Sequence, residues 1–177
     1  GRWIVVGGSD ESGPGLFKIP VDGGTPVRLV AGTATNPIWS PDGRTLSFFD
    51  QAKPFGVYVV RQDAPGRWGR TVRLAVGAVP SWFPDGRSVL VASREQAEGR
   101  LAFFRVDLAT GEPRLLLRTK GMGLPIRRPE VSPDGRAIVY VDRFGPEMGS
   151  GGAQLLRFDL ASGRDTELKR LDGKDDV

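Results

Sequence analysis

The sequence predicts an all-β fold of antiparallel strands, and three observations support this prediction. One nine-residue motif occurs three times, with its glycine at positions 43, 86 and 135. Short apolar runs bounded by Gly, Pro and Asp clusters follow each copy, which is typical of strands. No long window sustains a helical period of apolar residues. Four strands repeated about every 40 to 50 residues describe the blades of a β-propeller.

The repeated motif reads x-Pro-x-x-x-Pro-Asp-Gly-Arg and predicts the turn between the first two strands of each blade. Its copies span residues 36–44, 79–87 and 128–136. Proline presets φ at the first turn position, aspartate accepts local backbone hydrogen bonds, and glycine adopts the left-handed conformation. One such turn is common, but three copies in register indicate a repeat. We therefore assign a structural role to Pro41, Asp42, Gly43, Pro84, Asp85, Gly86, Pro133, Asp134 and Gly135.

The other strands are expected at fixed places relative to the motif. A short strand precedes each Pro-Asp-Gly turn, and three apolar runs follow it. The first runs cover 3–6, 45–49, 88–92 and 137–141, the second cover 16–19, 57–60, 101–106 and 155–158, and the third cover 27–30, 72–74, 114–117 and 166–168. These runs predict one propeller segment, 1–177, with blades at 1–34, 35–77, 78–124 and 125–171 and a polar tail at 172–177.

The number of blades has a consequence for ring closure. Gly1 and Arg2 match the end of a fourth motif copy, so blade one lacks its first strand. About four blades leave strand edges unpaired, which favours aggregation. We expect a partial propeller, half of a ring that a second copy closes, or a small ring with an incomplete blade.

Composition excludes several kinds of chemistry within this chain. It has no His and no Cys, so Ser-His-Asp triads, Cys-His dyads and Cys/His zinc sites cannot form. Gly-x-Ser-x-Gly is also absent. We predict no catalytic residue, metal or cofactor. The apolar runs are too short to span a membrane, and a net charge of +4 with both signs interspersed argues against nucleic acid as the partner.

The motif and two Asp-Leu-Ala-[Thr/Ser]-Gly hairpins, at 107–111 and 159–163, resemble the WD-like repeat of TolB-type propellers. The resemblance covers nearly the whole chain, although Phe83 replaces the motif serine of copy two and Glu130-Val131 stands where copy three would have its tryptophan. Both changes are compatible with the fold.

The resemblance implies a non-catalytic scaffold that binds another protein or a small ligand. Similar repeats also form the substrate-gating propeller of prolyl oligopeptidase-type serine peptidases and the sensor domains of bacterial kinases and transcription regulators, and these alternatives stay open. The sequence does not determine the compartment, but the resemblance to an envelope protein favours the bacterial periplasm or cell envelope.

Candidate binding residues lie where the propeller channel and the variable loops are expected. Loops after the first apolar runs and the links between blades share one face, and such variable loops usually carry binding. At this face we single out Asn36, Arg127, Arg128 and Glu130. The two arginines open an inner strand and could bind an anionic group. The alternative is a solvated Arg–Glu pair at a strand end.

The blade-two hairpin combines basic and aromatic side chains: Arg61, Arg67, Trp68, Arg70 and Arg73. Such a set of side chains could bind single-stranded nucleic acid. The preferred interpretation is a solvated hairpin whose tryptophan packs on the neighbouring blade. Trp39 and Trp82 share one repeat position and are expected in the core between blades.

Overall fold

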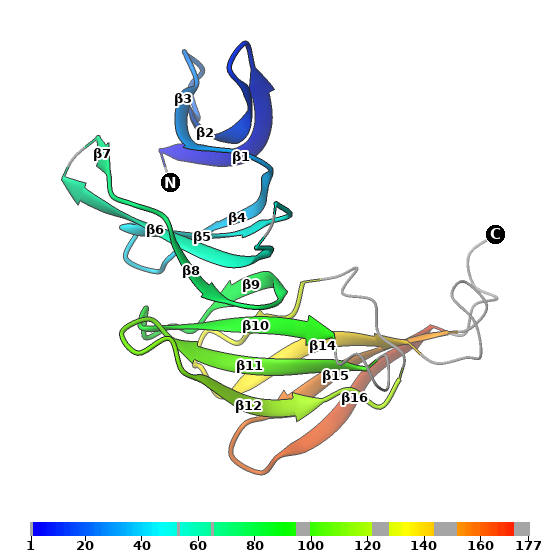
Figure 1. Ribbon diagram of the computed structural model, residues 1–177. Helices are drawn as coiled ribbons and strands as arrows, with labels where there is room; N and C mark the ends of the chain where they lie inside the picture. The colour runs from blue at the N-terminus through cyan, green and yellow to red at the C-terminus, as the bar shows by residue number, and fades with distance from the viewer. Residues whose placement is uncertain are drawn as a thin grey trace. The chain divides into compact units, whose positions relative to one another are not determined.

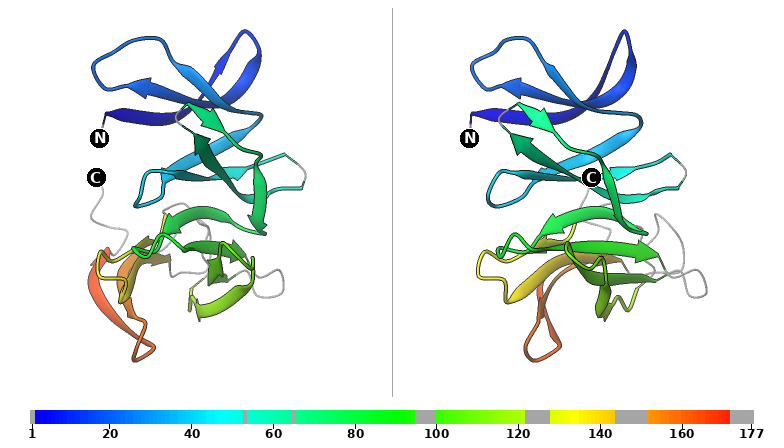
Figure 2. Two further views of the ribbon diagram at one scale, coloured as in Figure 1. Left: turned by 90° about the vertical axis from the view of Figure 1, so that its left-hand side faces the viewer. Right: turned by 60° about the vertical axis from the view of Figure 1, so that its left-hand side comes forward.

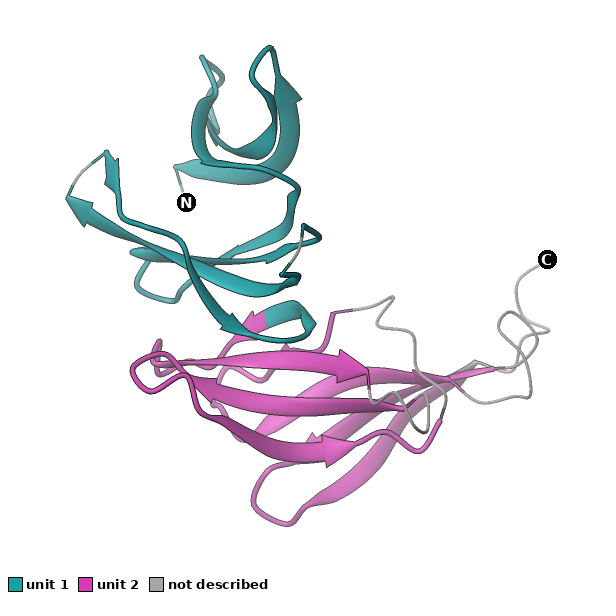
Figure 3. Cartoon of the chain, in the orientation of Figure 1, with its two compact units in different colours: residues 1–80 teal, residues 81–177 magenta. Residues whose placement is uncertain are grey.

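The protein is all-β in the computed structural model, which describes residues 2–52, 54–64, 66–94, 100–121, 128–143 and 152–171. These residues form sixteen strands and no helix, which confirms the predicted fold class (Figure 1). Within the described part of the chain, no helix is long and apolar enough to cross a membrane. The chain divides into two compact units, residues 1–80 and 81–177 (Figure 3).

Unit 1 is built from two sheets. The first has the order β1-β2-β3, and the second has the order β4-β5-β6-β7, with β8 also pairing with β6. Figure 2 shows β1, the first blue strand, at the edge of its sheet. The strands are β1 (Trp3–Asp10), β2 (Gly13–Pro20), β3 (Val27–Ala31), β4 (Ala34–Trp39), β5 (Thr45–Asp50), β6 (Gly56–Ala64), β7 (Arg67–Trp68) and β8 (Val72–Ala75).

Unit 2 also contains two sheets, and the boundary after Pro80 falls within β9. Their orders are β9-β10-β11-β12 and β13-β14-β15-β16. The strands are β9 (Ala78–Trp82), β10 (Ser88–Arg94), β11 (Leu101–Asp107), β12 (Pro113–Arg118), β13 (Glu130–Val131), β14 (Ala137–Arg143), β15 (Ala153–Asp159) and β16 (Arg164–Leu171).

Burial explains why the strand sequences are short apolar runs and do not alternate strictly. The first five residues of β10 are all buried, as are the first four of β5. Continuous burial means that both faces of these middle strands are covered, and covered strands read as apolar runs. The outer strand β12 is mostly exposed, and arginines flank its short apolar run, Leu115 to Leu117.

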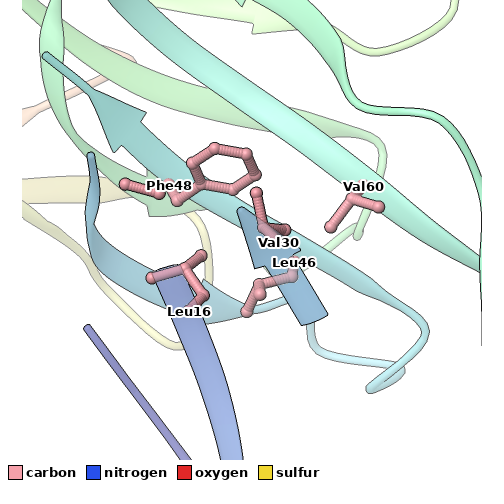
Figure 4. Close-up of a cluster of buried hydrophobic side chains, with 6 residues drawn as sticks. Leu16, Val30, Leu46, Phe48 and Val60 are labelled. Carbon is pink, nitrogen blue, oxygen red and sulfur yellow. The ribbon is translucent and has the colours of Figure 1, made fainter. Parts of the chain in front are cut away.

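A buried cluster joins the two sheets of unit 1. Leu16, Val30, Leu46, Phe48 and Val60 come from β2, β3, β5 and β6 and point toward one another (Figure 4). Burying a side chain of this size contributes about 1.5 to 3 kcal/mol. The cluster therefore holds the sheets of blades one and two face to face.

Two partly buried tryptophans are associated with this cluster. Trp39 and Trp68 both pack against it, and their ring centroids are 5.5 Å apart. Trp39 lies at the interface between sheets, as expected from its repeat position. Trp68 contacts the tryptophan of its own blade, which anchors the hairpin that carries it.

The motif turns of blades two and four share one hydrogen-bond pattern. Ser40 Oγ donates to Asp42 Oδ1 (2.5 Å) and accepts from the Thr45 amide (2.9 Å), while the Arg44 amide donates to the same carboxylate (3.0 Å). Ser132, Asp134, Arg136 and Ala137 repeat these contacts at 2.5, 2.9 and 3.0 Å. The glycines have φ of 68° and 70°, the left-handed conformation predicted from the turn chemistry.

Blade three forms the same turn with different side chains. Phe83 replaces the serine and is buried. Asp85 accepts instead from the Arg87 amide (2.8 Å) and from the Arg105 guanidinium (2.5 Å), which also lies 4.2 Å from the Phe83 ring centroid. Gly86 keeps a φ of 64°. The substitution is therefore compatible with the fold because Arg105 supplies the missing donor.

The serine–aspartate contacts predict an acid-dependent stability. The serine hydroxyl, as the largest cause, holds the pKa of Asp42 and of Asp134 below the ordinary value of 3.8. A lowered folded pKa stabilises the fold above the unfolded pKa, and this contribution is lost as the pH falls below about 3.8. We expect the double variant Ser40→Ala, Ser132→Ala to lose less stability than the wild type between pH 5 and pH 2.5.

Urea unfolding midpoints across this pH range measure the difference. Ser9→Ala, an exposed serine of β1, serves as the control and should follow the wild-type profile. Parallel profiles for the double variant and the wild type would contradict this account of the turns.

Candidate binding site

The first strands of blades two to four, β4, β9 and β13, carry the candidate site. Asn36, Val79 and Arg128 occupy the same repeat position, each directly before the first motif proline. Asn36 and Val79 have φ of 51° and 46°, and they are the non-glycine residues with positive φ among those the structure describes. The two left-handed residues therefore belong to one repeated feature of the inner strands.

This conformation is strained. Side chains with a Cβ avoid the left-handed region, and a residue before proline favours extended backbone. Around Asn36 the pairing of β4 with β5 shifts register between Thr35 and Ile38, so the strand bulges there. Such backbone strain costs about 1 to 3 kcal/mol and is found most often at functional sites. A bulge also changes the direction in which a side chain points. The exposed Asn36 side chain is presented by this bulge.

In unit 2 the predicted Arg–Glu pair forms and gains a third member. Arg128 Nε donates to Glu130 Oε1 at 2.6 Å, and Nη2 contacts the same oxygen. Glu130 Oε2 accepts from Ser81 Oγ at 3.0 Å. Ser81 is buried, whereas the Arg128 and Glu130 side chains are 43% and 53% exposed. The network thus joins β9 to β13 and leaves an accessible ion pair.

Of the four predicted site residues, three are among the residues that the structure describes. Arg128 and Glu130 come together in unit 2, while Asn36 belongs to unit 1. Arg127 lies outside the described residues. Ser81 was not among the predicted residues, although it shares its repeat position with Glu130 on the neighbouring inner strand. Aligning the repeats column by column would have suggested this contact.

A second repeated position is an aspartate in blades two and four, and it accepts hydrogen bonds from the links between blades. Asp50 and Asp142 stand at the same distance after the motif glycine. Asp50 Oδ1 accepts from Thr33 Oγ1 at 2.7 Å, and Asp142 Oδ2 accepts from the Lys120 and Gly121 amides at 3.2 and 3.0 Å. These carboxylates hold the links beside the ends of β5 and β14, and the sequence analysis assigned them no role.

Gly121 is packed too closely for any side chain. An added Cβ would lie 1.8 Å from the Arg143 carbonyl oxygen and 2.7 Å from Asp142 Oδ1. That Oδ1 is buried and has no hydrogen-bond partner. Within the described residues, no group of three or more Asp, Glu, His or Cys converges as a metal site would require. The buried carboxylate therefore has a structural role in the link.

One buried tyrosine of unit 2 has a strongly perturbed proton affinity. Tyr140 donates from its hydroxyl to Asp165 Oδ1 at 3.0 Å. Burial, followed by the negative charge of Asp165, raises the pKa of Tyr140 well above its ordinary value of 10. The phenol therefore stays protonated near neutral pH and serves as a hydrogen-bond donor.

The fold is that of TolB-like β-propellers. TolB from Acinetobacter baumannii is 20% identical, with a TM-score of 0.72, over 95% of this chain and 41% of that chain. A protein assigned as TolB from Agrobacterium tumefaciens is 20% identical, with a TM-score of 0.77, over 97% of this chain and 62% of its own. The β-propeller domain of the Trilobed protease from Pyrococcus furiosus is 13% identical, with a TM-score of 0.62, over 96% of this chain and 54% of its own.

These likenesses concern the fold alone. The chain spans between 41% and 62% of the length of the two TolB structures. No protein-family model matches the sequence, and no curated protein matches it. A propeller scaffold is therefore supported, and its role must be argued from the site.

Substitutions at Asn36 test the strained bulge. We expect Asn36→Val to lower the free energy of unfolding by about 1 to 2 kcal/mol, because a branched side chain is disfavoured in the left-handed region. Asn36→Gly should stay within about 0.5 kcal/mol of the wild type, since glycine adopts this region without penalty. Urea unfolding measures both variants. Equal stability of the valine and glycine variants would show that residue 36 is not left-handed.

Proposed function

We propose that the chain is a non-catalytic TolB-like propeller scaffold that binds another protein or a small ligand. Binding would take place at the start of the inner strands β4 and β13, with Asn36 as the candidate residue in unit 1 and Arg128 and Glu130 as the candidate residues in unit 2. The observation that carries the proposal is the left-handed backbone conformation, which recurs at one repeat position of two inner strands, at Asn36 and Val79, at an energetic cost. At Asn36 the strand also bulges and the side chain is exposed, so this position can present a side chain to a ligand.

The Arg128–Glu130 pair supports binding at the start of β13. An exposed ion pair contributes only about 0 to 1 kcal/mol, so its members can exchange partners at little cost. An acidic group of a ligand would compete for the guanidinium, and a basic group would compete for the carboxylate. Ser81 keeps Glu130 in place on one side, which limits its conformations.

The absence of catalysis is part of the proposal. The chain contains no His or Cys, so a nucleophile–histidine pair would need residues from outside it. A second copy that closes a ring is one protein partner compatible with the exposed edge of β1.

A second candidate is the gating propeller of a serine peptidase. The likeness to the protease propeller domain from Pyrococcus furiosus favours it. This candidate requires that the endogenous polypeptide also contain a catalytic domain with a nucleophilic serine and a histidine. A sensor domain of a kinase or regulator requires a kinase or DNA-binding domain instead.

Site-specific photo-cross-linking in the endogenous polypeptide tests the proposed binding positions. A cross-linker at position 36 and, in a separate sample, a cross-linker at position 128 should each give a discrete adduct, because both positions are exposed. Glu130→Ala should reduce the yield at position 128 about tenfold, because a charge-assisted contact is lost. A cross-linker at position 162, in the hairpin at the motif-turn end of its own sheet, is the control.

Two outcomes decide between the candidates. Equal adduct yields at positions 36, 128 and 162 would contradict the proposed binding positions. Intact-protein mass spectrometry of the same polypeptide, with fragment sequencing, identifies any further domain. A serine peptidase domain would replace the scaffold proposal with the gating one.

A further inference from the structure

The hairpin at the motif-turn end of each sheet begins with a repeated register position. In blade three this position is Asp107, opposite Ser88, and in blade four it is Asp159, opposite Ala137. Each aspartate accepts from two backbone amides of the turn that follows, at distances between 2.8 and 3.2 Å. In blades three and four the position therefore holds a carboxylate that closes the hairpin, whereas in blade one it is Pro20, opposite Trp3.

Blade two departs from this pattern by reversing the charge. Arg61 stands opposite Thr45, the register position that holds aspartate in blades three and four. The hairpin is also longer, because β6 continues to Ala64 and β7 pairs with its end (Figure 1). The backbone next to Arg61 is arranged as in the other blades, since the Gln62 amide donates to the Arg44 carbonyl at 2.8 Å.

This departure places two arginines side by side along the backbone where blades three and four have an arginine next to an aspartate. In blades three and four the motif arginines, Arg87 and Arg136, stand beside Asp107 and Asp159 through equivalent backbone bonds, from Leu108 and Leu160 at 2.9 Å. In blade two the motif arginine stands beside another arginine. The positive charges of neighbouring arginine side chains repel one another, and a bound anion reduces that repulsion.

The two arginines line an open cavity of about 550 Å³ together with Gln62, Asp63 and Ala64. Both side chains are exposed, and in the described part of the chain neither forms an ion pair within 4.0 Å. Asp42 lies within electrostatic reach of both, but its carboxylate already accepts from Ser40 and from the Arg44 amide.

One acidic residue of the cavity offsets part of the positive charge. Asp63 lies against Gly69, where an added Cβ would be 2.9 Å from Asp63 Oδ1. The return strand of the hairpin adds two more exposed arginines, Arg67 and Arg70. The hairpin and the motif turn therefore keep an excess of positive charge.

The hairpin is anchored, which limits the entropy that a bound ligand would cost. Gln62 pairs in register with Trp68, and Trp68 packs on Trp39 and on the buried cluster of unit 1. The Gly69 amide donates to the Arg61 carbonyl at 2.8 Å. Guanidinium groups held on a fixed backbone can donate paired hydrogen bonds to the oxygens of carboxylate and phosphate groups.

We propose that the cavity lined by Arg44 and Arg61 is a binding site for an oxyanion group, a carboxylate or a phosphate, of a ligand. This arginine site lies at the motif-turn end of the blade-two sheet, whereas the bulge at Asn36 lies toward the other end of β4. The site is therefore distinct from the one proposed above and does not depend on it.

Titration calorimetry of the full chain at low ionic strength tests the arginine site, with inorganic phosphate and a hexaglutamate peptide as separate probes. At least one probe should bind. Arg61→Asp, which introduces the residue of blades three and four, should weaken that binding about tenfold or more, because a charge-assisted contact is lost and a repulsion gained. Arg44→Gln should weaken it in the same direction and leaves the backbone contacts in place.

Arg114→Asp is the matched control, since it makes the same charge change at an exposed position of β12 that does not line the cavity. Its affinity should stay within about twofold of the wild type. Binding of phosphate alone would assign the site to phosphoryl groups, and binding of the peptide alone would assign it to acidic protein segments. Absence of binding to the wild type, or equal losses in Arg61→Asp and Arg114→Asp, would overturn the proposal.

Discussion

The contact on which the rest of the structure depends is the side-chain closure of the motif turn. A serine hydroxyl bridges the aspartate carboxylate and the first amide of the next strand, and a left-handed glycine completes the reversal. This closure sets the register of the first two strands of a blade. Since a shift of one residue would turn every side chain to the other face of the sheet, the turn also decides which residues are buried.

Because the turn is repeated, each departure from the repeat is informative. Phe83 removes the serine, and Arg105 compensates for it, so the fold is kept. Arg61 stands where blades three and four have a hairpin-closing aspartate, and the structure adds a second strand pairing while nearby carboxylates offset only part of the positive charge. Where another residue replaces the lost contact, the change from the repeat affects stability alone. Where no residue replaces it, the changed position is a candidate for binding. The strained bulge at Asn36 belongs to the second group.

Much of the architecture could be predicted from the sequence because it depends on local chemistry. The turn residues, the apolar runs and the absence of a helical period are readable within short windows, and they lead to the all-β propeller fold. Contacts between blades were not predictable in the same way. The Ser81–Glu130 bond and the amides that bind Asp142 join residues whose distance depends on how sheets pack. The left-handed φ of Asn36 was also missed, since proline at the next position favours extended backbone.

Amide hydrogen exchange at Thr45 and Ala137, followed by NMR, tests the central role of the motif turns most directly. Both amides donate to a motif serine at 2.9 Å, and both are buried. The account predicts that they exchange far more slowly than in an unfolded peptide and that Ser40→Ala accelerates exchange at Thr45 while Ala137 is unaffected. Exchange of both wild-type amides at the unfolded rate would contradict it.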